Sequence, residues 1–249
     1  MPKALFVDTS KCMACRACQV ACKQWHDLPA ERTRFEGTYE NPPRLSASTW
    51  RRVKFIEAER NGRTRWLFMS DACKHCTDAS CMAVCPTKAL FRNKFGAVDL
   101  DQEVCNGCRY CVAACPFGVI SFNEETSRVN KCILCPDRLE AGLKPACATT
   151  CPPGAITFGD REQLMAQAKK RLEELKAEGE EKAQIYGEKE LSGLGQFWLL
   201  LDRPSVYGLP EDPRYAVADV FSGSVFSVVA SLVVGIAAIV AFRERRGRE

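Results

Sequence analysis

Four groups of four cysteines divide the first 151 residues of this chain of 249, and no cysteine lies outside them. In the third group the spacing is C-x2-C-x2-C-x3-C-P, the run in which three thiolates hold one [4Fe-4S] cluster and the fourth ligates another. Sixteen thiolates therefore predict four [4Fe-4S] clusters. The groups, called tetrads one to four, are Cys12, Cys15, Cys18, Cys22; Cys73, Cys76, Cys81, Cys85; Cys105, Cys108, Cys111, Cys115; and Cys132, Cys135, Cys147, Cys151.

Two other uses of cysteine fit this pattern less well. Structural zinc sites usually combine two separated C-x2-C pairs rather than three cysteines at every third residue. Cysteines two residues apart, repeated four times, also make a poor disulfide framework. A structural zinc protein stays as the alternative, and it is distinguished by metal content.

Composition argues against several other classes of function. The formal net charge is +4, from 35 basic and 31 acidic residues, so no one-signed surface indicates nucleic acid. His26 and His75 are the only histidines, and neither forms C-x-x-C-H, the signal for covalent haem. We expect His75 to tune or pack near a cluster rather than to ligate it. No nucleotide or nucleophile motif appears, so the chain is expected to carry electrons and to hold no catalytic residue.

A repeat becomes visible when the tetrads are aligned on their last cysteine. Cys85, Cys115 and Cys151 are each followed by proline and then by an apolar run that predicts a strand. Short β-rich segments also precede the tetrads, at Ala4 to Val7, Arg65 to Met69 and Ala97 to Leu100. Two such units make a two-cluster ferredoxin, so the fold class is α+β. Spacing alone does not decide which units pair.

The last third of the chain differs from the cysteine-rich part. Residues 160–178 have apolar side chains at helical spacing and predict an amphipathic helix. Residues 179–215 are rich in glycine and proline, and they predict an irregular connection. Residues 220–242 contain no charged side chain and are long enough to cross a bilayer, which takes ~20 residues. We therefore predict a transmembrane helix at 216–242 and a tail at 243–249.

The basic residues of the tail predict the orientation of this helix. Arginines are concentrated after the apolar segment, whereas Arg214 is the one basic residue close before it. Because positive charge favours the cytoplasmic side, we expect a cytoplasmic C-terminus and a cluster domain on the outer, periplasmic face of the cell membrane.

Several segments together resemble one family. They are Cys12-Met-Ala-Cys-Arg-Ala-Cys-Gln-Val-Ala-Cys22, Tyr39-Glu-Asn-Pro42, Cys105-Asn-Gly-Cys-Arg-Tyr-Cys-Val-Ala-Ala-Cys-Pro-Phe117 and Gly208-Leu-Pro-Glu-Asp-Pro213. The chain resembles the iron-sulfur (beta) subunits of membrane-bound respiratory formate dehydrogenases, which are among the four-cluster ferredoxin-like subunits of molybdopterin oxidoreductases.

The resemblance implies two protein partners. One is a catalytic alpha subunit with a molybdopterin or tungstopterin cofactor, which oxidises formate and carries the export signal. The other is a membrane cytochrome b gamma subunit that reduces quinone. This chain would relay electrons between them through four [4Fe-4S] clusters. The same relay in a hydrogenase or a sulfur-compound oxidoreductase is the alternative.

The resemblance also implies a nested pairing of the units, with one two-cluster module inserted in the other. The outer module would comprise residues 1–70 and 120–160, and the inner module 71–119; a helix and connecting segment (161–215) would follow. The implied ligand sets are Cys12, Cys15, Cys18 and Cys151; Cys22, Cys132, Cys135 and Cys147; Cys73, Cys76, Cys81 and Cys115; and Cys85, Cys105, Cys108 and Cys111.

Overall fold

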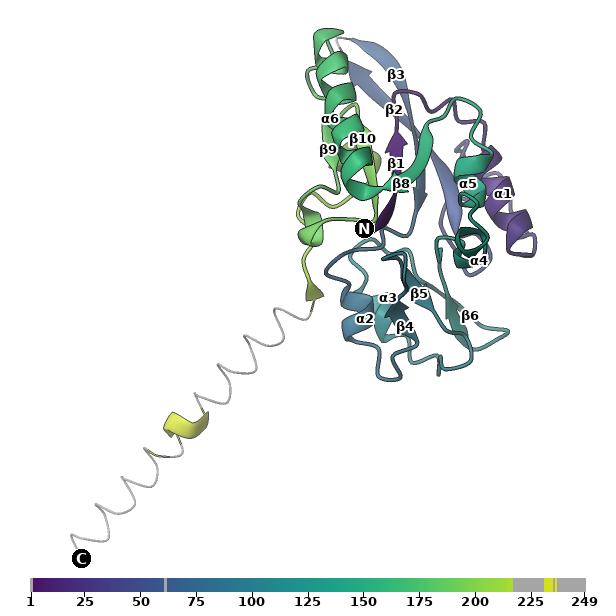
Figure 1. Ribbon diagram of the computed structural model, residues 1–249, viewed down its shortest axis with the longest axis vertical. Helices are drawn as coiled ribbons and strands as arrows, with labels where there is room; N and C mark the ends of the chain where they lie inside the picture. Colours follow the sequence, from purple (N-terminus) through teal and green to yellow (C-terminus); the bar gives the residue numbers. More distant parts are fainter. Residues whose placement is uncertain (1, 61, 217–230, 235, 237–249) are drawn as a thin grey trace, which may run out of the picture. The chain divides into compact units, whose positions relative to one another are not determined.

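The computed structural model describes residues 2–60, 62–216, 231–234 and 236, and the chain divides into two units, residues 1–214 and 215–249 (Figure 1). Apart from Ala216, residues 231–234 and Ile236, the predicted transmembrane helix at 216–242 and the tail at 243–249 lie outside the described residues. Among the helices that are described, none is both long and apolar enough to span a bilayer.

A four-stranded sheet with the order β8-β1-β10-β9 forms the centre of the first unit. Strands β1 (Lys3–Asp8) and β10 (Gln196–Leu200) pair in parallel in the middle, and both are apolar and almost fully buried. Strands β8 (Ile156–Asp160) and β9 (Gln184–Tyr186) pair antiparallel at the edges. Residues 3–8 and 196–200, which lie far apart in the sequence, are therefore neighbours in one sheet.

Helix α6 (Arg161–Ala177) packs on this sheet through contacts with β1, β8 and β9 (Figure 1). Its buried side chains include Leu164, Ala168 and Leu175, which the apolar spacing placed on one face. The predicted amphipathic helix is thus confirmed.

The prediction of an irregular connection over residues 179–215 was wrong, because β9 and β10 lie there. Five-residue apolar runs do not reveal their secondary structure by periodicity, and the glycines around this one suggested a loop. Gly187 has a φ of +107°, and a Cβ at this position would meet Phe197 of the adjacent strand. The glycine serves close packing against β10 instead of marking an unstructured segment.

A long hairpin occupies the stretch between tetrads one and two. Strands β2 (Arg51–Arg60) and β3 (Arg63–Ala72) pair in register from Arg51 opposite Ala72 to the turn. Trp198 of β10 donates a hydrogen bond from Nε1 to the Ser70 carbonyl of β3, at 3.0 Å. The hairpin thereby joins the central sheet.

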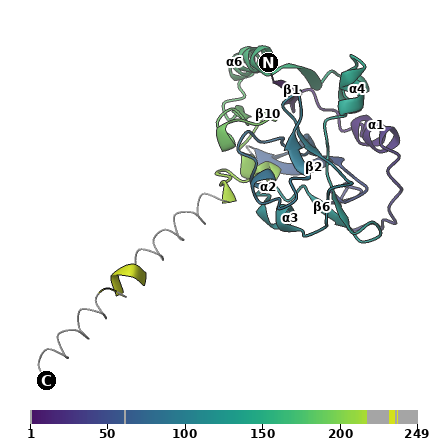
Figure 2. The same cartoon turned by 60° about the horizontal axis from the view of Figure 1, so that its bottom comes forward.

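The remaining elements are short and surround the tetrads. Helix α1 (Ala17–Trp25) contacts α5 (Figure 1), and α2 contacts α3 (Figure 2). Tetrads one and four thus lie on contacting elements, as do tetrads two and three, which agrees with the nested pairing. The bounds are α2 Ser80–Ala83, α3 Tyr110–Ala114, α4 Pro136–Glu140, α5 Ala146–Thr149, β4 Leu90–Arg92, β5 Val98–Leu100, β6 Ser121–Asn123, β7 Arg128–Asn130 and 3-10 helices Glu190–Ser192 and Pro204–Tyr207.

The short strands confirm the repeat. Strands β4, β6 and β8 follow the last cysteines of tetrads two, three and four, and β1, β3 and β5 lie where β-rich segments were predicted. Strand β4 pairs with β5, and β6 pairs with β7. The fold is α+β.

Candidate metal centres

The residue before the second cysteine is left-handed in all four tetrads. These residues are Ala14, His75, Gly107 and Leu134, with φ values of 56°, 47°, 70° and 68°. Alternation of right- and left-handed residues turns successive N–H groups towards one side, and such concavities bind anions, including iron-sulfur clusters. Only Gly107 has the residue type that signals this conformation, so the shared loop geometry was not apparent from the sequence.

Quartet A consists of Cys12, Cys15, Cys18 and Cys151. All four line one cavity, where about 320 Å³ is free of protein atoms, adjoining solvent included. Burial raises the pKa of the Cys12 thiol to about 11, and negative charge on the other three cysteines adds to this effect. Three neighbours in one loop and one distant cysteine thus surround a common space.

Quartet D consists of Cys85, Cys105, Cys108 and Cys111, and it also surrounds a cavity, of about 280 Å³ on the same measure. Burial raises the pKa of Cys111 to about 11, with further contributions from Cys108, Cys85 and Cys105. The last cysteine of tetrad two therefore lies with the first three of tetrad three.

Quartet B consists of Cys22, Cys132, Cys135 and Cys147. Burial raises the pKa of Cys22 well above the ordinary thiol value, and charge on the other three members raises it further.

Quartet C is formed by Cys73, Cys76, Cys81 and Cys115. Burial, followed by charge on Cys73, Cys115 and Cys81, raises the pKa of Cys76.

The four quartets fit iron-sulfur clusters in donor type. Around one zinc ion, sulfurs at 2.3 Å from the metal would stand only about 4 Å apart and leave no space between them. In quartets A and D, by contrast, the four cysteines line a common cavity. Burial disfavours the thiolate form, so these ligands depend on bound metal for their charge. The described residues contain no group of three or more His, Cys, Asp or Glu side chains arranged for a single ion.

Electrostatic coupling between the quartets gives their order. Charge on Cys18 of quartet A raises the pKa of Cys147 in quartet B. Charge on Cys73 of quartet C does the same to Cys132 of quartet B, and Cys111 of quartet D acts on Cys81 of quartet C. These effects support the series A, B, C, D as the order of the quartets.

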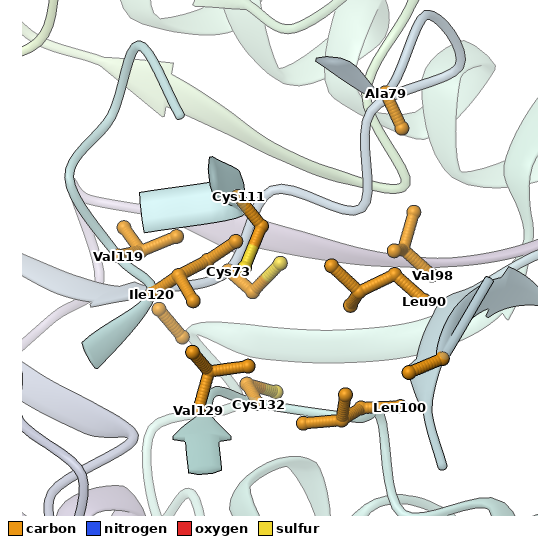
Figure 3. Close-up of a cluster of buried hydrophobic side chains, with 12 residues drawn as sticks. Cys73, Ala79, Leu90, Val98, Leu100, Cys111, Val119, Ile120, Val129 and Cys132 are labelled. Atoms are coloured by element: carbon orange, nitrogen blue, oxygen red, sulfur yellow. The ribbon is translucent and has the colours of Figure 1, made fainter. Parts of the chain in front are cut away.

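Quartet B is buried at all four cysteines, quartet C is buried only at Cys73, and quartets A and D each include an exposed cysteine. Cys73, Cys111 and Cys132, from three different tetrads, belong to one group of buried apolar side chains (Figure 3). Cys15 of quartet A and Cys108 of quartet D are the exposed cysteines among the sixteen.

The two histidines lie beside the quartets in different ways. His75 is 1% exposed, and its Nδ1 is 3.2 Å from the Val98 carbonyl oxygen. His26 Nε2 is 3.4 Å from Cys135 Sγ. No role for His26 could be predicted from the sequence, and its contact with a predicted ligand became visible only in the folded chain.

Buried cations were not anticipated either. Lys74, Lys131 and Arg51 are each 1% exposed. Lys74 forms an ion pair with Asp71, and Lys131 Nζ donates to the carbonyl of Cys132 at 3.0 Å. Lys74 and Lys131 are adjacent in sequence to Cys73 and Cys132, so their proximity to the predicted ligands could have been inferred from the sequence. Nothing in the sequence distinguishes Arg51 from other strand arginines.

Two family models match the cysteine-rich part of the chain. Both are described as a 4Fe-4S dicluster domain, and they cover residues 11–89 and 64–161.

Curated relatives resemble the chain over most of its length. The nitrate-inducible formate dehydrogenase iron-sulfur subunit of Escherichia coli K12 is 43% identical over 215 residues, 85% of this chain and 73% of the relative. The formate dehydrogenase-O iron-sulfur subunit of the same organism is 40% identical over 239 residues, 94% and 79% of the two chains. The formate dehydrogenase iron-sulfur subunit of Haemophilus influenzae is 39% identical over 237 residues, 93% and 76%.

Proposed function

Because this chain belongs to the family of formate dehydrogenase iron-sulfur subunits, we propose that it relays electrons from a formate-oxidising subunit towards a quinone-reducing one. The donor would be a catalytic alpha subunit that carries a molybdopterin or tungstopterin cofactor. The acceptor would be a membrane cytochrome b gamma subunit. Four [4Fe-4S] clusters would carry the electrons through this chain.

The observation that supports this proposal best is that cysteines from two different tetrads line one cavity in quartet A and another in quartet D. When bound, each cluster supplies a reversible one-electron couple. The chain's own residues supply the four thiolates of each set, the left-handed loops around them, and an apolar group that packs against most cysteines of quartets C and D. Solvent access would then be greatest at quartets A and D, which supports exchange of electrons with partners at these two ends.

The proposal also includes a membrane anchor. The uncharged segment 220–242 supports a transmembrane helix at 216–242, and the arginines after it support a cytoplasmic tail. The clusters would then lie on the periplasmic side of the cell membrane, and the helix would contact lipid and the gamma subunit.

The first experiment is an anaerobic pull-down of the tagged chain in detergent, with metal analysis and formate-dependent dye reduction. We expect about sixteen irons per chain, together with molybdenum or tungsten and formate activity. Zinc in place of iron would overturn the cluster proposal. Iron with hydrogen or sulfur-compound activity, and none with formate, would overturn the proposed donor.

A second experiment tests the relay itself. Cys108→Ser removes a predicted ligand at the exposed end of quartet D, so formate-dependent quinone reduction should fall at least tenfold. Reduction of an artificial dye by the catalytic subunit should persist, because it does not require this chain. Unchanged quinone reduction would argue against transfer through quartet D.

A further inference from the structure

Resting on the proposed relay function, we propose that Arg51 is a buried positive charge that raises the reduction potentials of the clusters in quartets A and B. The guanidinium would act on both clusters at once because β2 packs against α1, the helix that carries Cys18 of quartet A and Cys22 of quartet B. The clusters of quartets C and D would be affected much less.

The position of Arg51 is fixed by three elements. It begins β2, and its side chain points into the interior between the hairpin and the central sheet, where it is 1% exposed. Nη1 donates to Ser70 Oγ of β3 at 2.9 Å, and Nη2 donates to Gln196 Oε1 of β10 at 2.7 Å. Ser70 Oγ is in turn 3.3 Å from Cys18 Sγ of quartet A. The guanidinium is thus one hydrogen-bonded group away from a predicted ligand.

No carboxylate balances this charge in the part of the chain that the structure describes. Its ion pairs include Arg52 with Glu40 and Lys74 with Asp71, but none involves Arg51. The buried Nε of Arg51 makes no hydrogen bond. A buried charge without a counter-charge is costly, so another group of opposite sign must balance it.

The cysteines of two quartets supply that group. Burial lowers the pKa of Arg51, but negative charge on nearby cysteines outweighs this and raises it; these are Cys147, Cys132, Cys18 and Cys22. Cys18 belongs to quartet A, and the other three belong to quartet B. Thiolate-bound clusters would therefore be the counter-ion of Arg51.

This arrangement has a direct redox consequence. Reduction adds one electron to a cluster, so its charge becomes more negative, and a fixed positive charge nearby stabilises the reduced form. Removing the charge should lower the equilibrium constant for one-electron reduction at quartets A and B at least tenfold, which is ~59 mV per tenfold change.

Three substitutions separate charge from shape. Arg51→Gln removes the charge, whereas Arg51→Lys keeps it. Gln196→Glu places a carboxylate where the Arg51 Nη2 acceptor now lies and neutralises the guanidinium without removing it. Gln196 Nε2 is buried without a hydrogen-bond partner, so that change loses no bond. Arg52→Gln is the control, because Arg52 points to the opposite face of the strand and is paired with Glu40.

The experiment is a potentiometric titration of the purified complex with dithionite, followed by electron paramagnetic resonance. Iron and sulfide are measured first; a native chain without four [4Fe-4S] clusters would contradict the proposed function itself. With the clusters present, Arg51→Gln and Gln196→Glu should lower two of the four potentials, and Arg51→Lys and Arg52→Gln should not.

Two results would overturn the inference while leaving the relay intact. One is four unchanged potentials in both charge-neutralising variants at full iron content. The other is an equal shift in Arg51→Lys and Arg51→Gln, which would mean that hydrogen bonding, and not charge, matters at this position. If Arg51→Gln fails to retain iron, the test rests on Gln196→Glu. Unchanged potentials in that variant would then overturn the inference.

Discussion

At the scale of single residues, the cluster loops depend on backbone conformations that most side chains disfavour. A left-handed residue precedes the second cysteine of every tetrad, at a cost of about 1–2 kcal/mol for a non-glycine residue. Ala14, His75 and Leu134 tolerate this cost, so the loop geometry is maintained by the ligands and by the surrounding packing. Gly107 is a special case, because a Cβ there would collide with the Ser127 carbonyl oxygen.

Gly107→Ala should therefore disrupt quartet D. We expect loss of about four of the sixteen irons, since the strained φ and the collision together displace the Cys108 loop. Gly118→Ala is the matched control: its φ is +59°, but a Cβ there meets nothing within 4 Å. That variant should lose only about 1–2 kcal/mol of unfolding free energy and keep its iron. Equal iron contents in the two alanine variants would mean that the backbone shifts enough to avoid the collision between the new Cβ and the Ser127 carbonyl oxygen.

The carboxylate of Glu31 stabilises the loop before β2 through hydrogen bonds that depend on its ionisation. Its Oε1 accepts hydrogen bonds from Ser46 Oγ at 2.5 Å, Ser48 Oγ at 3.0 Å and Thr49 Oγ1. Burial raises the pKa of Glu31, but these hydrogen bonds lower it more, so it lies below the ordinary value.

The stability that Glu31 contributes should be complete above the unfolded pKa of about 4.3 and be lost as pH falls through the lower folded value. Glu31→Gln should thus have a lower thermal midpoint than the native chain, by a constant amount between pH 5 and pH 8. Thermal unfolding at several pH values measures this difference. A gap that closes between pH 8 and pH 5 would mean that the folded pKa is raised.

At the scale of elements, the two halves of the first unit are stabilised differently. The central sheet has fully buried apolar strands and a 17-residue covering helix. The inner segment 71–119 has strands of three residues and helices of four or five, and its buried group includes cysteines. Such short elements are not stable alone, so metal binding should supply much of their folding free energy.

Removal of iron by anaerobic chelation should therefore unfold the inner segment first. Hydrogen exchange followed by mass spectrometry should show lost protection across residues 71–119, while amides of β1, β10 and α6 stay protected. Uniform loss of protection in all elements would indicate that the clusters stabilise the whole unit cooperatively.

At the scale of the whole molecule, the cysteine quartets belong to the first unit and the proposed anchor belongs to the second. All sixteen cysteines precede residue 152. Assembly of the clusters should therefore be independent of the C-terminal segment.

Truncation after Arg214 should give a chain that keeps about sixteen irons but no longer sediments with membranes. The full-length chain, expressed with the same partners, is the control for the fractionation. Retention of the truncated chain in the membrane fraction would place attachment with a partner subunit. Loss of iron would mean that the two units fold together.

The sequence by itself determined the repeated unit and the amphipathic helix, and it predicts the number and type of the cluster ligands. These features are local, because x2 spacing and helical periodicity are properties of a few consecutive residues. The family resemblance added the grouping into quartets, which stays a prediction that the couplings between cysteines support.

Only the tertiary structure decided which side chains from distant segments meet. Pairing of β1 with β8 and β10 brings residues 3–8, 156–160 and 196–200 together, and β10 then places Gln196 against Arg51 of β2. The burial of Arg51, with no carboxylate paired to it among the residues that the structure describes, follows from these non-local contacts. Side chains whose environment is set by strand pairing across nearly 200 residues leave no periodic signal in the sequence.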